Sequence, residues 1–201
     1  FQYGWCFGFG YFLFSLYWIS ISLTFDQSFK FLIPVAIILL PAFLASFYGL
    51  ITYLFSNFYS KDVVSSFLIF SILFGAIEYL RGSVLSGFPW NLISFSFSNN
   101  IYFIQILSII GTYSFNLICI SLFTVPALFI LRKSKKEILV CFFFIFLSIS
   151  FLVFGKIKSD DFNSIKSIKN SYSIKAISPN ISIDRFYSKQ DELKIINELI
   201  K

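Results

Sequence analysis

The sequence predicts a mainly α-helical protein that crosses a membrane about five times and then begins a second, water-soluble domain. Of its 201 residues, 57% are hydrophobic and only 13% are charged, whereas a soluble domain usually carries about 25% charged residues. Thirty phenylalanines in a soluble protein would expose large apolar patches to water. Lipid is therefore the expected solvent for most of the chain, which predicts a polytopic transmembrane helical bundle.

Five apolar stretches are long enough to cross a bilayer, which requires about 17–25 helical residues. Because hydrocarbon offers no hydrogen bonds to the backbone, each stretch is expected to be a helix. The fourth is too long for one simple span, so its start is expected to lie along the membrane surface. The stretches are residues 4–23, 31–56, 63–80, 101–131 and 138–154.

The connections between these stretches are short, so consecutive helices are expected to pack antiparallel. Residues 26–30 close the first connection and residues 57–62 close the second. Within the first stretch, Gly4 and Gly8 are four residues apart in an apolar helix. This spacing is typical of a close helix–helix contact and is preferred here to a nucleotide-binding loop, because Leu13 replaces the third glycine.

The fourth connection, residues 132–137, reads RKSKKE and carries four positive charges in six residues. Positive charge near a membrane span favours the cytoplasmic side. Alternation then places the connections 26–30 and 81–100 on the outer side, together with everything after Lys156. The C-terminal part is thus expected on the side of the membrane opposite to the cytoplasm.

A change in composition at Gly155 marks the expected domain boundary. Residues 1–155 form the transmembrane domain and residues 156–173 a polar linker, rich in Lys, Ser and Asn. Residues 174–201 then begin the water-soluble domain. There a short apolar strand, 174–177, ends before Pro179, and an amphipathic helix is predicted over 189–201.

A polar segment stands out at the end of the third stretch, residues 78–91, which reads EYLRGSVLSGFPWN. Glu78 and Arg81 lie three residues apart on one helical face, where they can neutralise each other. Gly87 and Pro89 interrupt regular helix, and Trp90 favours a membrane interface. Two interpretations remain open: an ion pair that anchors the helix end, or a rim that binds an amphiphilic substrate through Glu78, Arg81, Phe88 and Trp90.

Several kinds of chemistry are excluded or disfavoured by residue content. The chain has no histidine, which excludes a Ser-His-Asp triad, a Cys-His pair and histidine metal sites within it. Its three cysteines, Cys6, Cys119 and Cys141, lie in apolar stretches without CxxC spacing and are expected to be free, small hydrophobic residues. Neither a metal nor another cofactor is expected, and nothing indicates nucleic-acid binding.

Four segments in the same order resemble the bacterial apolipoprotein N-acyltransferase family. Residues 78–82 and 86–90 resemble its E-x-L-R-G and T-G-F-P-W segments, and residues 8–23 resemble an earlier helix of the family. Residues 105–114 resemble its next helix. Residues 176–181 (AISPNI) resemble the strand that opens the family's nitrilase-like (CN hydrolase) domain, although Ser178 and Ser182 depart from the usual Gln and Pro.

This resemblance implies an N-acyltransferase that works in lipoprotein maturation. It also implies the inner (cytoplasmic) membrane as the location of the protein, with the C-terminal domain on the periplasmic or outer side. Such enzymes transfer an acyl chain from a phospholipid to the N-terminal cysteine amine of a diacylated apolipoprotein, through a thioester on a Cys assisted by a Glu and a Lys. The expected partners are therefore the phospholipid donor, the apolipoprotein acceptor and membrane lipid, and the protein is expected to be a monomer. The α/β domain begun at 174–201 would be the nitrilase-like domain.

No catalytic residue is assigned within the chain, which contains no methionine and is interpreted as a piece of a longer protein. Lys175, Glu192, Glu198 and Lys201 lack the family's catalytic context, and Cys141 lies in a membrane span. The chain alone is therefore expected to be inactive. Two alternatives remain: a transporter or channel subunit, and an inactive truncated membrane protein.

Overall fold

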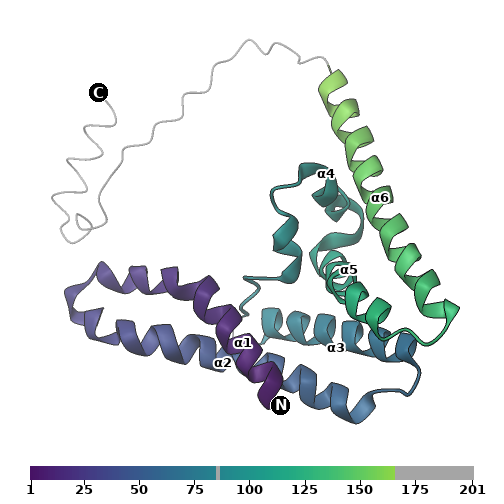
Figure 1. Ribbon diagram of the computed structural model, residues 1–201. Coiled ribbons are helices and arrows are strands. Elements are labelled where there is room, and N and C mark those ends of the chain that lie inside the picture. The colour runs from purple at the N-terminus through teal and green to yellow at the C-terminus, as the bar shows by residue number, and fades with distance from the viewer. Residues whose placement is uncertain (85–86, 166–201) are drawn as a thin grey trace.

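The computed structural model describes residues 1–84 and 87–165, and every regular element in those residues is a helix. Five of these helical segments are long and apolar enough to cross a membrane, which confirms the predicted multi-pass helical architecture. The predicted strand 174–177 and helix 189–201 lie outside the described residues. Figure 1 shows the order along the chain: α1 (Gln2–Leu16), η1 (Tyr17–Thr24), η2 (Gln27–Leu32), α2 (Ile33–Phe58), α3 (Val63–Ser83), η3 (Ile93–Phe97), α4 (Ile101–Ile104), α5 (Leu107–Ile130) and α6 (Lys135–Ser164).

The first two spans form an antiparallel hairpin in which α1 packs along α2. Gly8 lies so close to α2 that an added Cβ would be 2.9 Å from the Cβ of Tyr48. A Cβ on Gly4 would collide with the carbonyl oxygen of Tyr48. The close helix–helix contact predicted from the glycine spacing is therefore confirmed.

The first span changes from α-helix to a 3₁₀-helix at Tyr17, which the sequence did not predict. In this segment the hydroxyls of Ser20, Ser22 and Thr24 each donate to the carbonyl three residues earlier, at 2.6–2.7 Å. Such local hydrogen bonds compete with the regular α-helical pattern and accompany the tighter winding.

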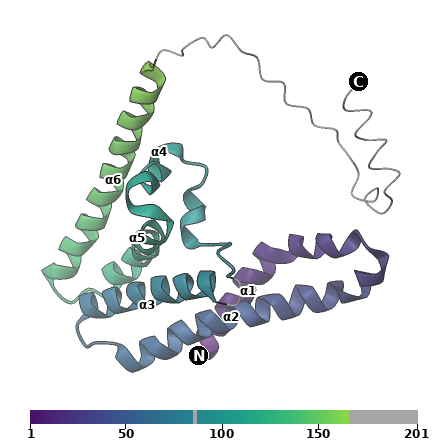
Figure 2. The same cartoon turned by 180° about the vertical axis from the view of Figure 1, so that it is seen from behind.

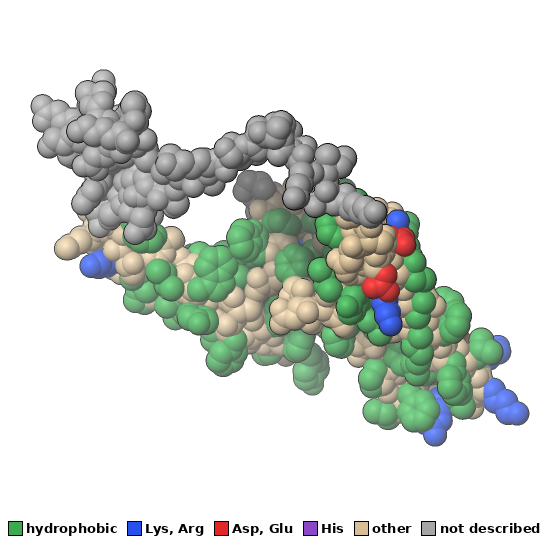
Figure 3. Space-filling model, turned by 90° about the horizontal axis from the view of Figure 1, so that it is seen from above, with side chains coloured by type: hydrophobic (Ala, Val, Ile, Leu, Met, Phe, Trp, Pro, Cys, Tyr) green, Lys and Arg blue, Asp and Glu red, His purple; other side chains and the backbone are tan. Residues whose placement is uncertain are grey.

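Beyond the hairpin, α3 packs against both α2 and α5, and α6 packs against α4 and α5. The two opposite views place α6 on the other side of the bundle from α1 (Figures 1 and 2). Hydrophobic side chains cover much of the molecule's surface in Figure 3, as expected for helices that face lipid. The bundle therefore has a largely apolar exterior, in contrast to the buried polar residues described below.

The fourth apolar stretch, 101–131, is divided rather than continuous. The single turn α4 is followed by α5, within which Gly111 has φ 74° and ψ 171° and interrupts the helix. Glycine adopts this conformation readily because it lacks a Cβ. The stretch is therefore long because it contains a bend before the spanning portion, and not because one helix extends over its whole length.

The last helix, α6, continues to Ser164 and so includes the first nine residues of the segment expected to be a linker. It begins at a capping box, in which Ser134 and Glu137 satisfy each other's backbone and side-chain groups. The remainder of the segment, from residue 166, lies outside the described residues. The boundaries 1–155, 156–173 and 174–201 therefore stay a prediction.

Candidate substrate-facing loop and its buried polar support

Glu78 lies inside the bundle, with a side chain that is 0% exposed. Its Oε1 accepts a hydrogen bond from the Tyr48 hydroxyl at 2.9 Å and lies 3.3 Å from Arg81. Its Oε2 accepts from the Asn116 amide at 2.5 Å. Three helices, α2, α3 and α5, therefore meet at one carboxylate, and each brings a donor to it.

Arg81 is also buried, at 1% exposure, and its guanidinium connects the carboxylate to the segment that follows α3. Nη2 faces Glu78, whereas Nη1 donates to the carbonyl oxygens of Phe88 and Trp90, both at 2.9 Å. The guanidinium carbon also lies 5.2 Å from the ring centre of Phe12 on α1, a favourable cation–π distance. Arg81 thus holds residues 88–90 against the bundle.

The segment after α3 turns sharply, and glycine permits the turn at two places. Gly87 has φ 78°, and a Cβ there would collide with the carbonyl oxygen of Gly82. A Cβ on Gly82 would in turn collide with the Tyr113 hydroxyl. The backbone N–H of Phe88 donates back to the Arg81 carbonyl at 3.0 Å, so main chain and side chain of Arg81 both fix the loop.

Two further contacts hold the far side of the loop, and the sequence analysis missed both. Asn116 Oδ1 accepts from the Ser94 backbone N–H at 2.9 Å, and the Tyr11 hydroxyl donates to the Asn91 carbonyl at 3.0 Å. Asn116 was detectable in principle, because an amide in the middle of an apolar span is rare unless it has a partner. Tyr48 and Tyr11 gave no such signal among the chain's many aromatic residues.

The surface of the loop is aromatic and not charged. Trp90 is 54% exposed, and its ring centre lies 5.6 Å from that of Trp18. Beside it is a shallow hollow of about 420 Å³, lined by Pro89, Trp90, Leu92, Phe95, Thr112 and Tyr113. This surface, which we call the Trp90 surface, is suited to an amphiphile whose apolar part contacts rings.

The structure brings all four predicted site residues together but in two layers. Phe88 and Trp90 belong to the loop, whereas the charges of Glu78 and Arg81 lie beneath it and do not form an exposed rim. The predicted ion pair is confirmed. A direct contact of any of these residues with substrate stays a prediction.

Pairing and hydrogen bonding make the burial of Glu78 and Arg81 energetically tolerable. An isolated charge inside a bilayer costs several kcal/mol, and here each charge has an opposite charge and additional hydrogen-bond partners. Over the described residues, no cluster of three or more His, Cys, Asp or Glu side chains could hold a metal ion. The arrangement is thus suited to shaping a loop and contains no recognisable set of catalytic groups.

Comparison with known proteins agrees with the resemblance seen in the motifs. A family model described as the apolipoprotein N-acyltransferase N-terminal domain matches residues 1–125. The apolipoprotein N-acyltransferase of Rhizobium etli (strain CIAT 652) is 37% identical over 137 residues, which cover 68% of this chain and 26% of the relative. That of Rhizobium leguminosarum bv. trifolii (strain WSM2304) is 40% identical over 135 residues, 67% of this chain and 25% of the relative.

No solved structure matches the chain. The matched region spans about a quarter of the length of these curated relatives. The family-model match, residues 1–125, contains α1 to α4 and most of α5, and with them the loop, Glu78, Arg81 and Asn116. Because the family model matches more than half of the chain, the chain belongs to the apolipoprotein N-acyltransferase family.

Proposed function

We propose that this chain is the membrane-spanning part of an enzyme that moves an acyl chain from a phospholipid to a diacylated apolipoprotein. The acceptor atom is the α-amino nitrogen of the lipoprotein's N-terminal cysteine. Support comes from the family, from the five apolar helices and from the four motifs in order. The family favours this function over the transporter or channel alternative. An inactive remnant would form no triacylated product in the activity test described below.

One observation carries the role of this chain in the reaction: a buried arginine holds the loop that presents Trp90. Both substrates are amphiphiles that arrive within the membrane, and an exposed tryptophan at a membrane interface contacts such molecules well. We place the approach of the lipid substrates at the Trp90 surface. Phe88 lies within the same loop, while Glu78 and Arg81 act from beneath as positioning residues.

The chemistry itself is proposed to occur in the nitrilase-like domain of the full-length protein. In the first step the Cys thiolate attacks the phospholipid ester, forms a thioester and releases a lysophospholipid. In the second step the lipoprotein amine attacks the thioester, forms an amide and releases the thiol, with Glu as the base and Lys stabilising the oxyanion. No residue of the present chain matches these three, so the chain alone is expected to yield no triacylated product.

The test compares Trp90→Ala with Phe146→Ala, a lipid-facing aromatic on α6 that is 69% exposed, in the full-length protein. Purified variants would be incubated with phospholipid and a diacylated lipopeptide, and the triacylated product measured by mass spectrometry. Loss of a positioning contact can lower turnover on the order of 10²-fold, and we expect this for Trp90→Ala alone. Normal turnover of Trp90→Ala would remove the Trp90 surface from the proposal.

We also propose that the protein resides in the inner membrane, as a monomer, with residues 132–137 in the cytoplasm. Cysteines placed at Ser134 and Ser164, at the two ends of α6, report on this in a chain whose native cysteines have been replaced. An impermeant thiol reagent applied to cells without an outer permeability barrier should label position 164 and spare position 134. The reverse pattern would overturn the orientation.

A further inference from the structure

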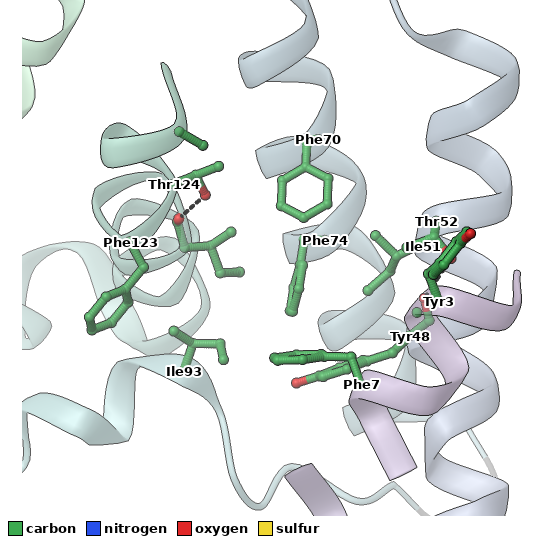
Figure 4. A pocket seen from close by; sticks show the side chains of 13 residues that line it. Tyr3, Phe7, Tyr48, Ile51, Thr52, Phe70, Phe74, Ile93, Phe123 and Thr124 are labelled. Atoms are coloured by element: carbon green, nitrogen blue, oxygen red, sulfur yellow. Dashed lines mark hydrogen bonds between the residues drawn. The ribbon is translucent and has the colours of Figure 1, made fainter. Parts of the chain in front are cut away.

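A groove runs along α3, and its mouth lies at the end of α3 away from the Trp90 surface. Its inner part is a cavity of about 430 Å³ between α1, α2, α3, η3 and α5. Figure 4 shows Phe70 and Phe74 of α3 at the back of this cavity, with Phe123 on one side and Tyr48 on the other. The lining is almost entirely hydrocarbon, which suits an alkyl chain.

The cavity continues toward the start of α3 through two more hollows, of about 240 and 480 Å³. Successive hollows share lining residues, so together they form one groove with α3 as its floor and α2 and α5 as its walls. The first two share Phe70, Thr124 and Ala127; the second and third share Phe55, Val63, Ser66 and Leu131.

The mouth of the groove is basic. Lys61 and Lys133 line its outermost hollow together with Tyr59 and Ser60, and both lysines are exposed. Within the described residues, neither lysine forms an ion pair. The nearby carboxylate of Asp62 is engaged elsewhere, since it accepts from the backbone N–H and the hydroxyl of Ser65, both at 2.8 Å.

We propose that this groove binds one anionic membrane phospholipid, with its phosphate between Lys61 and Lys133 and an acyl chain along α3 toward Tyr48. The apolar interior of the groove suits the acyl chain of such a lipid, and the two lysines at its mouth suit the phosphate. Basic pockets between membrane helices are known to bind anionic headgroups. The headgroup end of the site is separate from the Trp90 surface, because the 21 residues of α3 place its two ends about 30 Å apart. The bound chain would end at Tyr48, which also donates to Glu78.

The test is lipid binding to the full-length protein, purified and delipidated in detergent, measured by native mass spectrometry. Titration with phosphatidylglycerol and with phosphatidylcholine of the same chains should show a preference for the anionic lipid on the order of tenfold. The double variant Lys61→Ala/Lys133→Ala should lose this preference. The matched variant Lys30→Ala/Lys156→Ala, which removes the same charge away from the groove, should keep it.

A second variant, Ala127→Phe, fills the point where the first two hollows meet. It should weaken binding of both lipids, because it blocks the acyl chain and leaves the lysines in place. Equal binding of the two lipids by the unmodified protein, or an unchanged preference in Lys61→Ala/Lys133→Ala, would overturn the proposal. Undiminished binding to Ala127→Phe would also overturn it, as expected if a protein segment fills the groove. The lysine variants alter only exposed side chains and decide the headgroup contact even if Ala127→Phe misfolds. None of these outcomes depends on acyltransferase activity.

Discussion

The two ends of α3 handle charge in opposite ways. At its start, Lys61 and Asp62 are exposed, and Asp62 caps the helix through Ser65. At its end, Glu78 and Arg81 are 0% and 1% exposed and are hydrogen-bonded to three other segments of the protein, α2, α5 and the loop. The difference teaches that charge at the start of α3 stays on the exterior of the protein, whereas charge at the end organises the protein's own backbone.

The internal pair is the more demanding arrangement. Two buried charges lose their hydration, and only good geometry with additional hydrogen bonds compensates for that loss. Here the additional partners are the Tyr48 hydroxyl, the Asn116 amide and two loop carbonyls. Substitution of Glu78 or Arg81 should therefore displace the loop, whereas a substitution at the start of α3 should affect only its immediate surroundings.

The largest effect is expected for Glu78→Ala. This change leaves the Arg81 guanidinium buried without its counter-charge, and breaking a buried pair costs about 3–5 kcal/mol. Unfolding in detergent should show a loss of that size, while Asp160→Ala, at an exposed carboxylate, should change little. In a double-mutant cycle, Glu78→Ala/Arg81→Ala should cost less than the sum of the single changes. Additive costs would show that the two side chains do not act as a pair.

A smaller effect is expected for Gly82→Ala, which tests how tightly the loop packs. The new methyl group would collide with the Tyr113 hydroxyl, and overpacking of this kind costs about 1–3 kcal/mol. Tyr113→Phe should restore part of the stability in the double variant, because it removes the colliding atom. Gly10→Ala serves as the control, since no atom lies within 4 Å of a Cβ there. If both glycine variants lose stability equally, the close approach is not the cause.

The smallest effect is expected at the start of α3, from Asp62→Asn. Hydrogen bonds from Ser65 hold the pKa of the Asp62 carboxyl below its usual value, so its charged form is favoured by folding. That contribution is present above the unfolded pKa of about 3.9 and is lost as pH falls through the lower folded pKa. Asparagine caps a helix without titrating. The variant should match the parent at neutral pH and lose a small part of the destabilisation in acid; an identical acid profile would contradict the assignment.

The sequence predicted the architecture well because the physics is strong and local. Long apolar runs must be helical in lipid, and the spacing of Gly4 and Gly8 indicated the α1–α2 contact. The bend at Gly111 and the 3₁₀ segment after Tyr17 were missed, since each depends on backbone geometry that composition does not reveal.

For the site, the sequence located the segment and the ion pair but not their depth. A charge near a helix end is ordinarily at the membrane surface, and nothing local showed that Tyr48, Asn116 and the carbonyls of the loop would enclose the pair. These partners come from positions 30 or more residues away from Glu78 or from loop carbonyls that carry no side-chain signal. Burial therefore emerges only when α2, α3 and α5 are assembled.

The central claim is that Arg81 positions the loop that presents Trp90, and Arg81→Lys tests it most directly. Lysine keeps the positive charge beside Glu78 but lacks the planar fork that donates to two carbonyls and a carboxylate at once. The full-length variant should accumulate to nearly normal abundance in the membrane. Its lipopeptide acylation per folded molecule should fall on the order of 10²-fold, as for Trp90→Ala. Normal specific activity, whatever the abundance, would contradict the claim.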